Sequence, residues 1–180
     1  MLDFIAPLKK SLCFLVPVVV LTICACAPAS SDKQAASSSK QAATPGPIDA
    51  DAANEFTTTD SGLKYRILRK ADGPKPTADD WVEVHYAGTL DDQSEFDSSY
   101  QRGSPFSTAL TQVIPGWTEG LQLVNRGGMI ELEIPAELGY GSRGAGGAIP
   151  PNATLHFTIE LLNVFTVDQY GNLAAKKAVE

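Results

Sequence analysis

The stretch Val113-Ile114-Pro115-Gly116-Trp117-Thr118-Glu119-Gly120-Leu121 decides the fold of this 180-residue chain. Pro115 suits the first turn of a helix, where the backbone N–H has no intrahelical partner. Gly127-Gly128 stops the pattern, so we expect a helix that ends near Asn125. A helix this short, with Gly120 inside it, does not persist alone in water. It must therefore pack against another part of the protein.

Trp117 begins an apolar stripe on this helix. Leu121 follows at i+4 and Val124 at i+7, so the three side chains share one face. Because strand-like segments surround the helix in the sequence, we expect this face to pack under a sheet. The indole of Trp117 would then form the floor of a small apolar pocket.

The surrounding segments have the pattern of strands that are buried on one face only. Residues 81–87, 129–134 and 155–161 alternate apolar and polar side chains, and residues 63–70 are a further strand candidate. Such strands together with one helix predict an antiparallel sheet that covers the helix.

The sequence between the second strand candidate and the helix has no clear period. Residues 91–94 predict a turn, after which the chain resumes at residues 96–99. Residues 100–112, which include Gly103 and Pro105, predict an irregular loop.

The first 25 residues have the features of a lipoprotein-type signal peptide. Lys9 and Lys10 precede an apolar run of about a dozen residues, which is too short to span a bilayer. Cys26 follows Ala25, as in a bacterial lipobox, so Cys26 is the predicted lipidation site. The alternative is cleavage after Ala29, which would release a soluble exported product.

Composition divides the rest of the chain into three parts. Residues 26–55 are rich in Ala, Ser, Gln and Pro and predict a disordered tether. Residues 56–165 have the pattern of a folded domain. Residues 166–180 form a polar tail that is expected to fray.

Charge and cysteine content exclude several classes of function. The net charge is −7 and the sequence pI is about 4.8, without a Lys/Arg cluster, which argues against a nucleic-acid-binding protein. The cysteines are Cys13, Cys24 and Cys26, so the folded part has neither disulfides nor thiol chemistry.

The sequence also lacks a convincing motif for metal binding, nucleotide binding or covalent catalysis. His85 and His156 lie on the outward phase of their strands and predict surface positions, without metal-ligand spacing or a catalytic triad. Residues 139–144 match G-x-G-x-x-G, but Gly and Pro follow where a nucleotide site needs a helix. We therefore expect no metal and no cofactor.

Several motifs resemble the FKBP-type peptidyl-prolyl cis-trans isomerases, with the bacterial exported branch as the nearest relatives. They occur in the family's order over residues 62–165. The motifs are Val84-His85-Tyr86-Ala87-Gly88, Phe96-Asp97-Ser98-Ser99, residues 113–120, residues 136–141 and residues 149–155. The resemblance implies an α+β fold in which a five-stranded antiparallel sheet wraps around one short α-helix.

The resemblance also implies roles for individual residues. Trp117 would be the pocket floor, and Tyr140 would donate its hydroxyl to a substrate carbonyl. Asp97 would sit at the rim as an orienting charge, with Arg102 as its partner. Asp97, Tyr140 and Trp117 are thus the three predicted catalytic residues. A substrate-binding set accompanies them, in which the backbone N–H of Ile114 also donates to the substrate. The set consists of Tyr86, Phe96, Phe106, Val113, Ile114, Ile149 and Phe157.

The chain departs from the family pattern at the outer wall of the pocket. Thr108 stands where the family commonly has an apolar side chain, and Ala145 and Ala148 are small. The loop before Val113 is also shorter than in small single-domain members. We expect these changes to leave the floor intact and to affect macrolide affinity and the preference for the residue before proline.

The predicted function is acceleration of X–Pro isomerisation during the folding of exported proteins. The alternative is a chaperone-like module that binds Pro-containing or unfolded segments without turnover. The expected ligands are unfolded or partly folded client proteins and rapamycin-like macrolides, and the protein is expected to be a monomer. Ala27, after the lipidated Cys26, favours an outer-membrane anchor facing the periplasm, with a soluble periplasmic or cell-surface protein as the alternatives.

Overall fold

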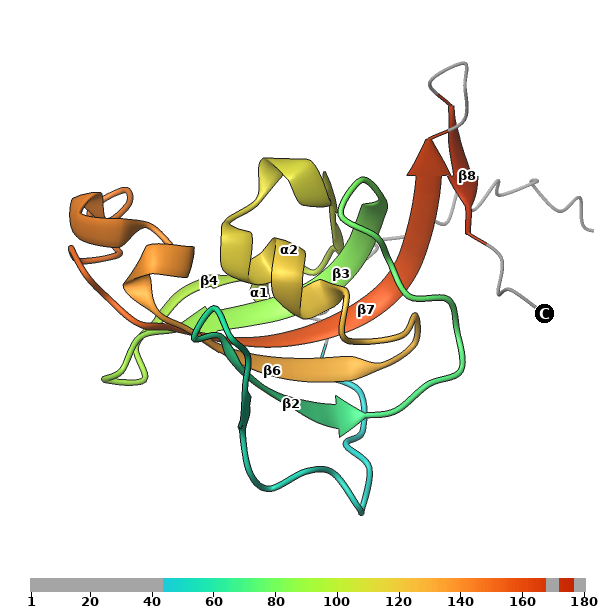
Figure 1. Cartoon of the computed structure of the whole chain (residues 1–180), viewed down its shortest axis with the longest axis horizontal. Helices are drawn as coiled ribbons and strands as arrows, with labels where there is room; N and C mark the ends of the chain where they lie inside the picture. Colours follow the sequence, from blue (N-terminus) through green and yellow to red (C-terminus); the bar gives the residue numbers. More distant parts are fainter. Residues whose placement is uncertain (1–43, 168–171, 177–180) are drawn as a thin grey trace, which may run out of the picture. The chain divides into compact units, whose positions relative to one another are not determined.

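One antiparallel sheet organises the part of the chain that the computed structural model describes, residues 44–167 and 172–176. Within these residues, eight strands pair in the order β1-β2-β6-β7-β3-β4, while β5 pairs with β3 and β8 pairs with β7 (Figure 1). The strands are β1 Thr57–Thr58, β2 Lys64–Arg69, β3 Trp81–Thr89, β4 Glu95–Ser98, β5 Phe106–Ala109, β6 Met129–Ile134, β7 Leu155–Val167 and β8 Leu173–Ala175. The predicted signal peptide, Cys26 and the first part of the tether lie outside the described residues.

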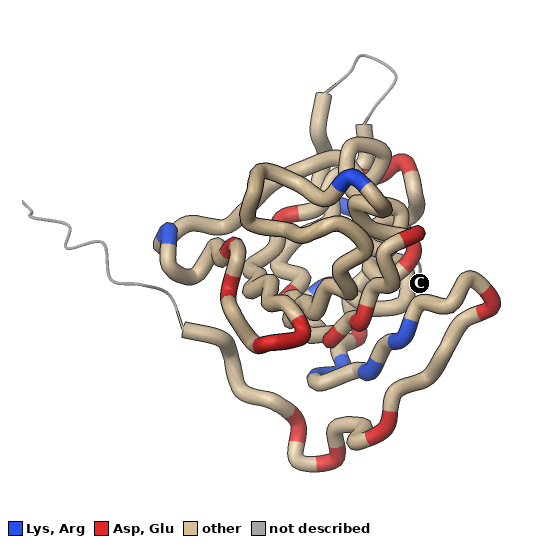
Figure 2. The backbone as a smooth tube through the Cα atoms, turned by 90° about the vertical axis from the view of Figure 1, so that its left-hand side faces the viewer, with Lys and Arg blue, Asp and Glu red and all other residues tan. Residues whose placement is uncertain are grey.

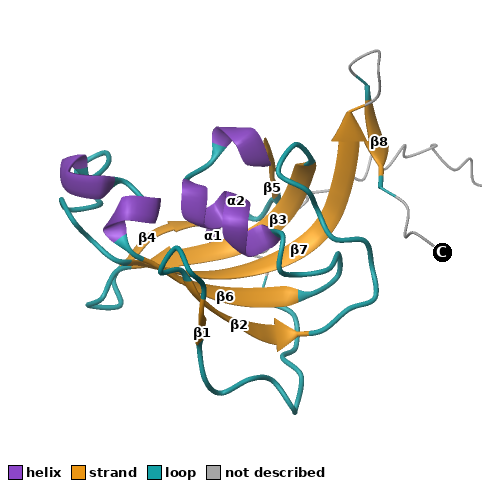
Figure 3. Cartoon of the chain, in the orientation of Figure 1, coloured by secondary structure: helices purple, strands orange, loops and turns teal. Residues whose placement is uncertain are grey.

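The predicted α+β class is confirmed. Because apolar and polar residues alternate along the strands, one face of the sheet is buried and the other is partly exposed. In β3, Val82, Val84 and Tyr86 are buried, while the residues between them are partly exposed. In β6, Glu131 and Glu133 point outward, as predicted. The helix α2 (Pro115–Leu121) lies on the opposite, inward face (Figure 3), where the core collects.

The outward face carries cross-strand ion pairs. Lys64 of β2 pairs with Glu133 of β6 at 2.6 Å, and Arg66 pairs with Glu131, also at 2.6 Å. Both pairs join residues that are direct register partners in the sheet. The basic positions of β2 are therefore matched by acidic partners rather than forming a basic surface (Figure 2).

The prediction of an irregular loop at residues 100–112 is wrong. The segment contains the end of α1 (Ser99–Arg102), the strand β5 and a 3₁₀ turn at Leu110–Gln112. Ser98 caps α1 by accepting a hydrogen bond from the Gln101 N–H. Each of these elements has four residues or fewer, which is too short for a hydrophobic period to show in the sequence.

The ends of the domain extend further than predicted. Where the tail was expected to fray, β7 continues to Val167 and β8 pairs with it. Lys176 then closes an ion pair with the buried Asp80 at 2.7 Å. The described part of the domain therefore contains more than the five strands expected, because the short strands β1, β5 and β8 also join the sheet.

Residues 46–54, which the sequence analysis assigns to the disordered tether, lie along the sheet in the structure. The Asp49 N–H donates to the Leu68 carbonyl at 2.9 Å, and the Ala53 N–H donates to the Ile67 carbonyl at 3.3 Å. The Lys70 N–H donates to the Asp49 carboxylate at 2.7 Å. The folded domain thus begins before Phe56, and we call residues 46–54 the strap.

The central helix, α2 (Pro115–Leu121), packs against the inward face of the sheet (Figure 1). Pro115 occupies its first turn, as predicted. The helix ends at Leu121, four residues before the predicted Asn125, because the chain continues in tighter turns such as Leu123 N–H to Gly120 C=O. Val124 nevertheless remains buried, so the predicted stripe is intact. No helix in the described ranges is both long and apolar enough to cross a membrane.

Two glycines bring α2 close to β6. A Cβ on Gly116 would lie 2.5 Å from Ile134, and a Cβ on Gly120 would lie 2.5 Å from Leu132. Both Ile134 and Leu132 are fully buried, so they have little room to move. Glycine at these positions therefore sets the distance between helix and sheet.

Replacing Gly120 by Ala should lower the free energy of unfolding by about 1–3 kcal/mol, because overpacking costs more than the better helix former gains. Urea unfolding measures the effect. In a Leu132→Ala background the clashing Cδ atoms are gone, so the same substitution should cost little or should stabilise the protein. An equal loss in both backgrounds would contradict this explanation.

Candidate functional site

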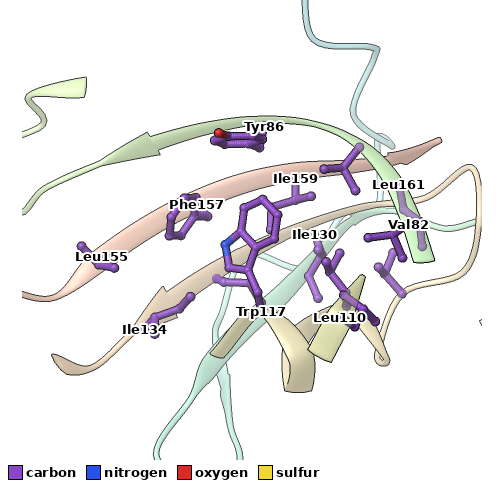
Figure 4. Packing of buried hydrophobic residues seen from close by; sticks show 14 of the residues in the cluster. Val82, Tyr86, Leu110, Trp117, Ile130, Ile134, Leu155, Phe157, Ile159 and Leu161 are labelled. Atoms are coloured by element: carbon purple, nitrogen blue, oxygen red, sulfur yellow. The ribbon is translucent and has the colours of Figure 1, made fainter. Parts of the chain in front are cut away.

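An aromatic cluster forms the centre of the candidate site. Trp117 of α2 meets Tyr86 of β3 and Phe157 of β7, with ring centroids 5.0 and 5.2 Å apart and interplanar angles of 84° and 83°. Phe106 of β5 lies 6.5 Å from the indole, also edge-on. These edge-to-face contacts are the favoured geometry of aromatic pairs. Figure 4 shows Tyr86, Phe157 and Trp117 converging from three elements.

Trp117 lies buried in this cluster, at the position where the sequence analysis places the pocket floor. The residue is only 4% exposed. Its indole N–H is buried and has no acceptor among the described residues. An unpaired buried donor costs about 1–3 kcal/mol, so stability alone does not explain a tryptophan at this position.

The cluster opens into a pocket of about 680 Å³. This volume lies within the range of small-ligand sites in proteins. Most of the predicted site residues line it, together with Gln112, which the sequence analysis missed. The lining residues are Tyr86, Phe96, Asp97, Arg102, Phe106, Gln112, Val113, Ile114, Trp117, Tyr140 and Phe157.

Ile149, predicted to bind substrate, is not among the residues that line this pocket. It is 8% exposed and packs into the core cluster. Its backbone pairs with Ala145 in both directions at 3.0 Å, which closes the loop that carries the glycine-rich sequence. Ile149 thus supports this loop from behind.

Thr108 and the histidines also lie apart from the pocket. Thr108 is buried in β5 opposite Val82, and its hydroxyl donates to the Ala109 carbonyl at 3.3 Å. His85 and His156 are partly exposed, in agreement with their outward phase. His156 contacts Asp91 at 2.8 Å.

Two hydrogen-bond donors are placed around the pocket mouth. Ile114 is the N-cap of α2, and its carbonyl accepts from the Trp117 and Thr118 N–H groups at 2.9 and 3.2 Å. Its own N–H has no protein acceptor in the described part of the chain. Tyr140 is 42% exposed and brings its phenol to the pocket lining. Both donors are free to meet carbonyl groups of a bound peptide.

A charged network stands beside the aromatic walls. The Tyr86 hydroxyl donates to one oxygen of Asp97, and the Arg102 guanidinium donates to the other. Arg102 also donates to the Tyr86 oxygen at 2.9 Å and lies over the Tyr86 ring. The side chains of Asp97 and Arg102 are both 43% exposed, so the pair sits at the rim, as predicted.

Burial and the hydrogen bond to Asp97 raise the pKa of Tyr86 to about 12. The hydrogen bond to Tyr86 raises the pKa of Arg102 as well. At neutral pH the phenol is therefore a hydrogen-bond donor and the guanidinium a fixed cation. Tyr86 is thus both a wall of the apolar pocket and a link to its charged rim.

Gly88 matters for the site because there is no room for a side chain at its position. A Cβ at this position would lie 2.7 Å from both the Phe157 and the Phe96 rings. These two rings meet edge-on at 5.5 Å. The glycine therefore allows the Phe96 and Phe157 rings to pack against each other beside β3. The sequence analysis did not identify this role.

Residues 73–162, half of the chain, match the family model described as FKBP-type peptidyl-prolyl cis-trans isomerase. A probable isomerase of this type from Haemophilus influenzae is 52% identical over 110 residues, which cover 61% of this chain and 46% of that protein. The crystal structure of FkpA from Escherichia coli superposes with a TM-score of 0.60 at 50% identity, covering 62% of this chain and 52% of that one.

A further relative carries a name that refers to the cell envelope. The outer membrane protein MIP of Legionella longbeachae is 49% identical over 104 residues, which cover 58% of this chain and 45% of that protein. The chain therefore spans about half the length of the curated relatives it matches.

The raised pKa of Tyr86 makes a prediction about alkaline stability. The folded protein favours the neutral phenol, so this contribution is complete below the ordinary tyrosine pKa of about 10 and is lost as the pH rises towards 12. The stability advantage over Tyr86→Phe should therefore shrink across this window. Unfolding midpoints measured with pH test this, with Tyr65→Phe as control, and a constant advantage would contradict it.

Proposed function

The chain belongs to the family of FKBP-type peptidyl-prolyl cis-trans isomerases, and from this premise we propose that it accelerates cis–trans isomerisation of X–Pro bonds in protein clients. The observation that carries the proposal is the aromatic pocket over Trp117, with free donors and a paired carboxylate at its mouth. This pocket is sized for a prolyl ring and its neighbours.

The chemistry of the reaction suits such a pocket. Rotation about the X–Pro bond breaks amide resonance against a barrier of about 18–20 kcal/mol, without breaking a covalent bond. A catalyst need only bind the twisted amide better than the planar one. The twisted amide has less charge separation than the planar amide. Transfer into an apolar pocket therefore costs the twisted form less free energy than the planar form. A difference of about 5 kcal/mol would accelerate the step nearly 10⁴-fold.

The residues divide this task between them. The prolyl ring packs on Trp117, between Tyr86 and Phe157, while the Ile114 N–H and the Tyr140 hydroxyl hold the flanking carbonyls. Asp97 is an orienting charge rather than a general base, because Tyr86 and Arg102 already engage both of its oxygens. The same apolar volume would also accept a rapamycin-like macrolide.

We further propose that the protein is exported and lipid-anchored through Cys26, in the outer membrane facing the periplasm. Support comes from the signal-like first 25 residues, the small Ala25 before the cysteine and the name of the Legionella relative. The clients would then be proteins that fold outside the cytoplasm. A soluble periplasmic or cell-surface protein is the competing outcome.

Trp117→Leu should lower the isomerisation rate by roughly ten- to a hundredfold, because it removes most of the pocket floor. NMR exchange spectroscopy on an X–Pro peptide measures the rate. The matched control is Trp81→Leu, which changes a partly exposed tryptophan of β3 outside the pocket lining.

The wild type itself must accelerate exchange at micromolar concentration, or the proposed activity is wrong. Client protection that survives Asp97→Asn while exchange falls would show that binding and turnover are separable. Protection without any exchange in the wild type would favour the chaperone-like module.

Labelling cells with a radioactive fatty-acid precursor tests the anchor. The full chain should incorporate the label and fractionate with the outer membrane, whereas Cys26→Ala should lose both. Cys24→Ala is the matched control and should keep the label. An unlabelled wild-type chain in the soluble fraction would support the soluble alternative.

A further inference from the structure

A largely buried ion pair lies on the sheet face opposite the pocket. Arg69 of β2 meets Glu160 of β7 at 2.5 Å, with side chains only 18% and 14% exposed. Gly46 and Pro47 of the strap pass over it: the Gly46 N–H approaches Glu160 at 3.4 Å, and Arg69 donates to the Pro47 carbonyl at 3.3 Å. The strap thus shields the pair from water.

Glu160 is also connected to α1. The Tyr100 hydroxyl donates to its second oxygen at 3.2 Å. The Tyr100 ring is 6% exposed and stacks on His85, the register partner of Glu160, with centroids 4.7 Å apart. Burial of the phenol raises the pKa of Tyr100, so it remains a donor at neutral pH. Tyr100 therefore fastens α1 to the outward face of the sheet.

The helix α1 needs such attachments, since four residues cannot hold a helical conformation alone. Ser99, fully buried, gives a second one: its hydroxyl oxygen accepts from the Tyr86 N–H at 2.8 Å and lies 2.9 Å from the His85 ring nitrogen. Both attachments involve the first half of α1. Its last residue is Arg102, whose guanidinium reaches Tyr86 and Asp97 at the pocket.

The short helix, which directly follows β4 and packs beside β3, thus connects residues on the two faces of the sheet. One side of α1 is fixed by Tyr100 to Glu160 on the outward face. The other side delivers Arg102 to the pocket rim on the inward face. A change in the first contact should therefore move the second.

We propose that Glu160 and Tyr100 are positioning residues for the pocket, which act through α1 to hold Arg102 against Asp97 and Tyr86. The proposal rests on the proposed isomerase function for its consequence in turnover. The geometry of Arg102 can be tested without turnover.

Two variants of the full chain test the proposal. Tyr100→Phe removes the hydroxyl and keeps the ring stack on His85, while Glu160→Gln removes the charge and keeps the shape. Each should lower kcat/KM by roughly three- to tenfold, in line with the loss of a hydrogen bond to a charged group. The loss should fall mainly on kcat, because the apolar walls that hold the prolyl ring are unchanged.

The second readout is the NMR spectrum of the Arg102 guanidinium, assigned through Arg102→Lys. Two-point contact with Asp97 and Tyr86 restricts rotation of this group, so the wild type should give separate Nη signals. These signals should merge in Tyr100→Phe and Glu160→Gln. If the wild type shows no isomerisation, the proposed function fails, and this spectrum still decides the positioning role.

Matched controls come from the same sheet. Tyr65→Phe removes a tyrosine hydroxyl on β2. Glu131→Gln removes the negative charge from the Arg66–Glu131 ion pair, which lies on the outward face away from α1. Both should retain turnover and the Arg102 signals. Equal losses in the controls, or unchanged Arg102 signals in the two test variants, would overturn the proposal. A loss in Glu160→Gln without one in Tyr100→Phe would also overturn it, because the route through the tyrosine would then be absent.

Discussion

The close contact between α2 and β6 is the constraint on which the structure depends. A seven-residue helix has too few internal hydrogen bonds to persist alone, so its position is set by packing. Gly116 and Gly120 let the helix backbone approach Ile134 and Leu132 more closely than any larger residue would allow. That approach places Trp117 under the rings of Tyr86 and Phe157. The depth of the pocket therefore follows from two missing side chains where the helix faces β6.

The pocket combines an apolar interior with a charged rim, and Tyr86 allows both to exist side by side. Its ring belongs to the aromatic walls, while its hydroxyl takes part in the network of Asp97 and Arg102. Tyr86 and Arg102 together engage both carboxylate oxygens of Asp97, so this charge has partners within the protein. In the proposed function, a bound amide would meet apolar walls with fixed dipoles at their edge, an arrangement suited to preorganised catalysis.

Sequence patterns predicted the parts of the structure that repeat or that resemble a known family. The alternation in β3, β6 and β7 identified the sheet, and the motifs around Asp97 and Trp117 identified most of the pocket lining. The prediction failed where an element was too short to show a repeating hydrophobic pattern, as in β5 and α1, which have four residues each. It also failed where long-range pairing decides, as for the strap and β8, since their composition alone resembles disordered chain. Ile149 was wrongly placed in the pocket lining and Gln112 was missed, because each lies in a segment whose conformation the sequence pattern does not specify.

The strap has a consequence for how the domain behaves in a crowded compartment. Its N–H groups at Asp49 and Ala53 occupy carbonyls of β2 near the edge of the sheet, where β1 covers only two residues. Free edge carbonyls are templates on which strands of other chains can add. The segment upstream of the family-matched region thus acts as a guard against intermolecular β-pairing.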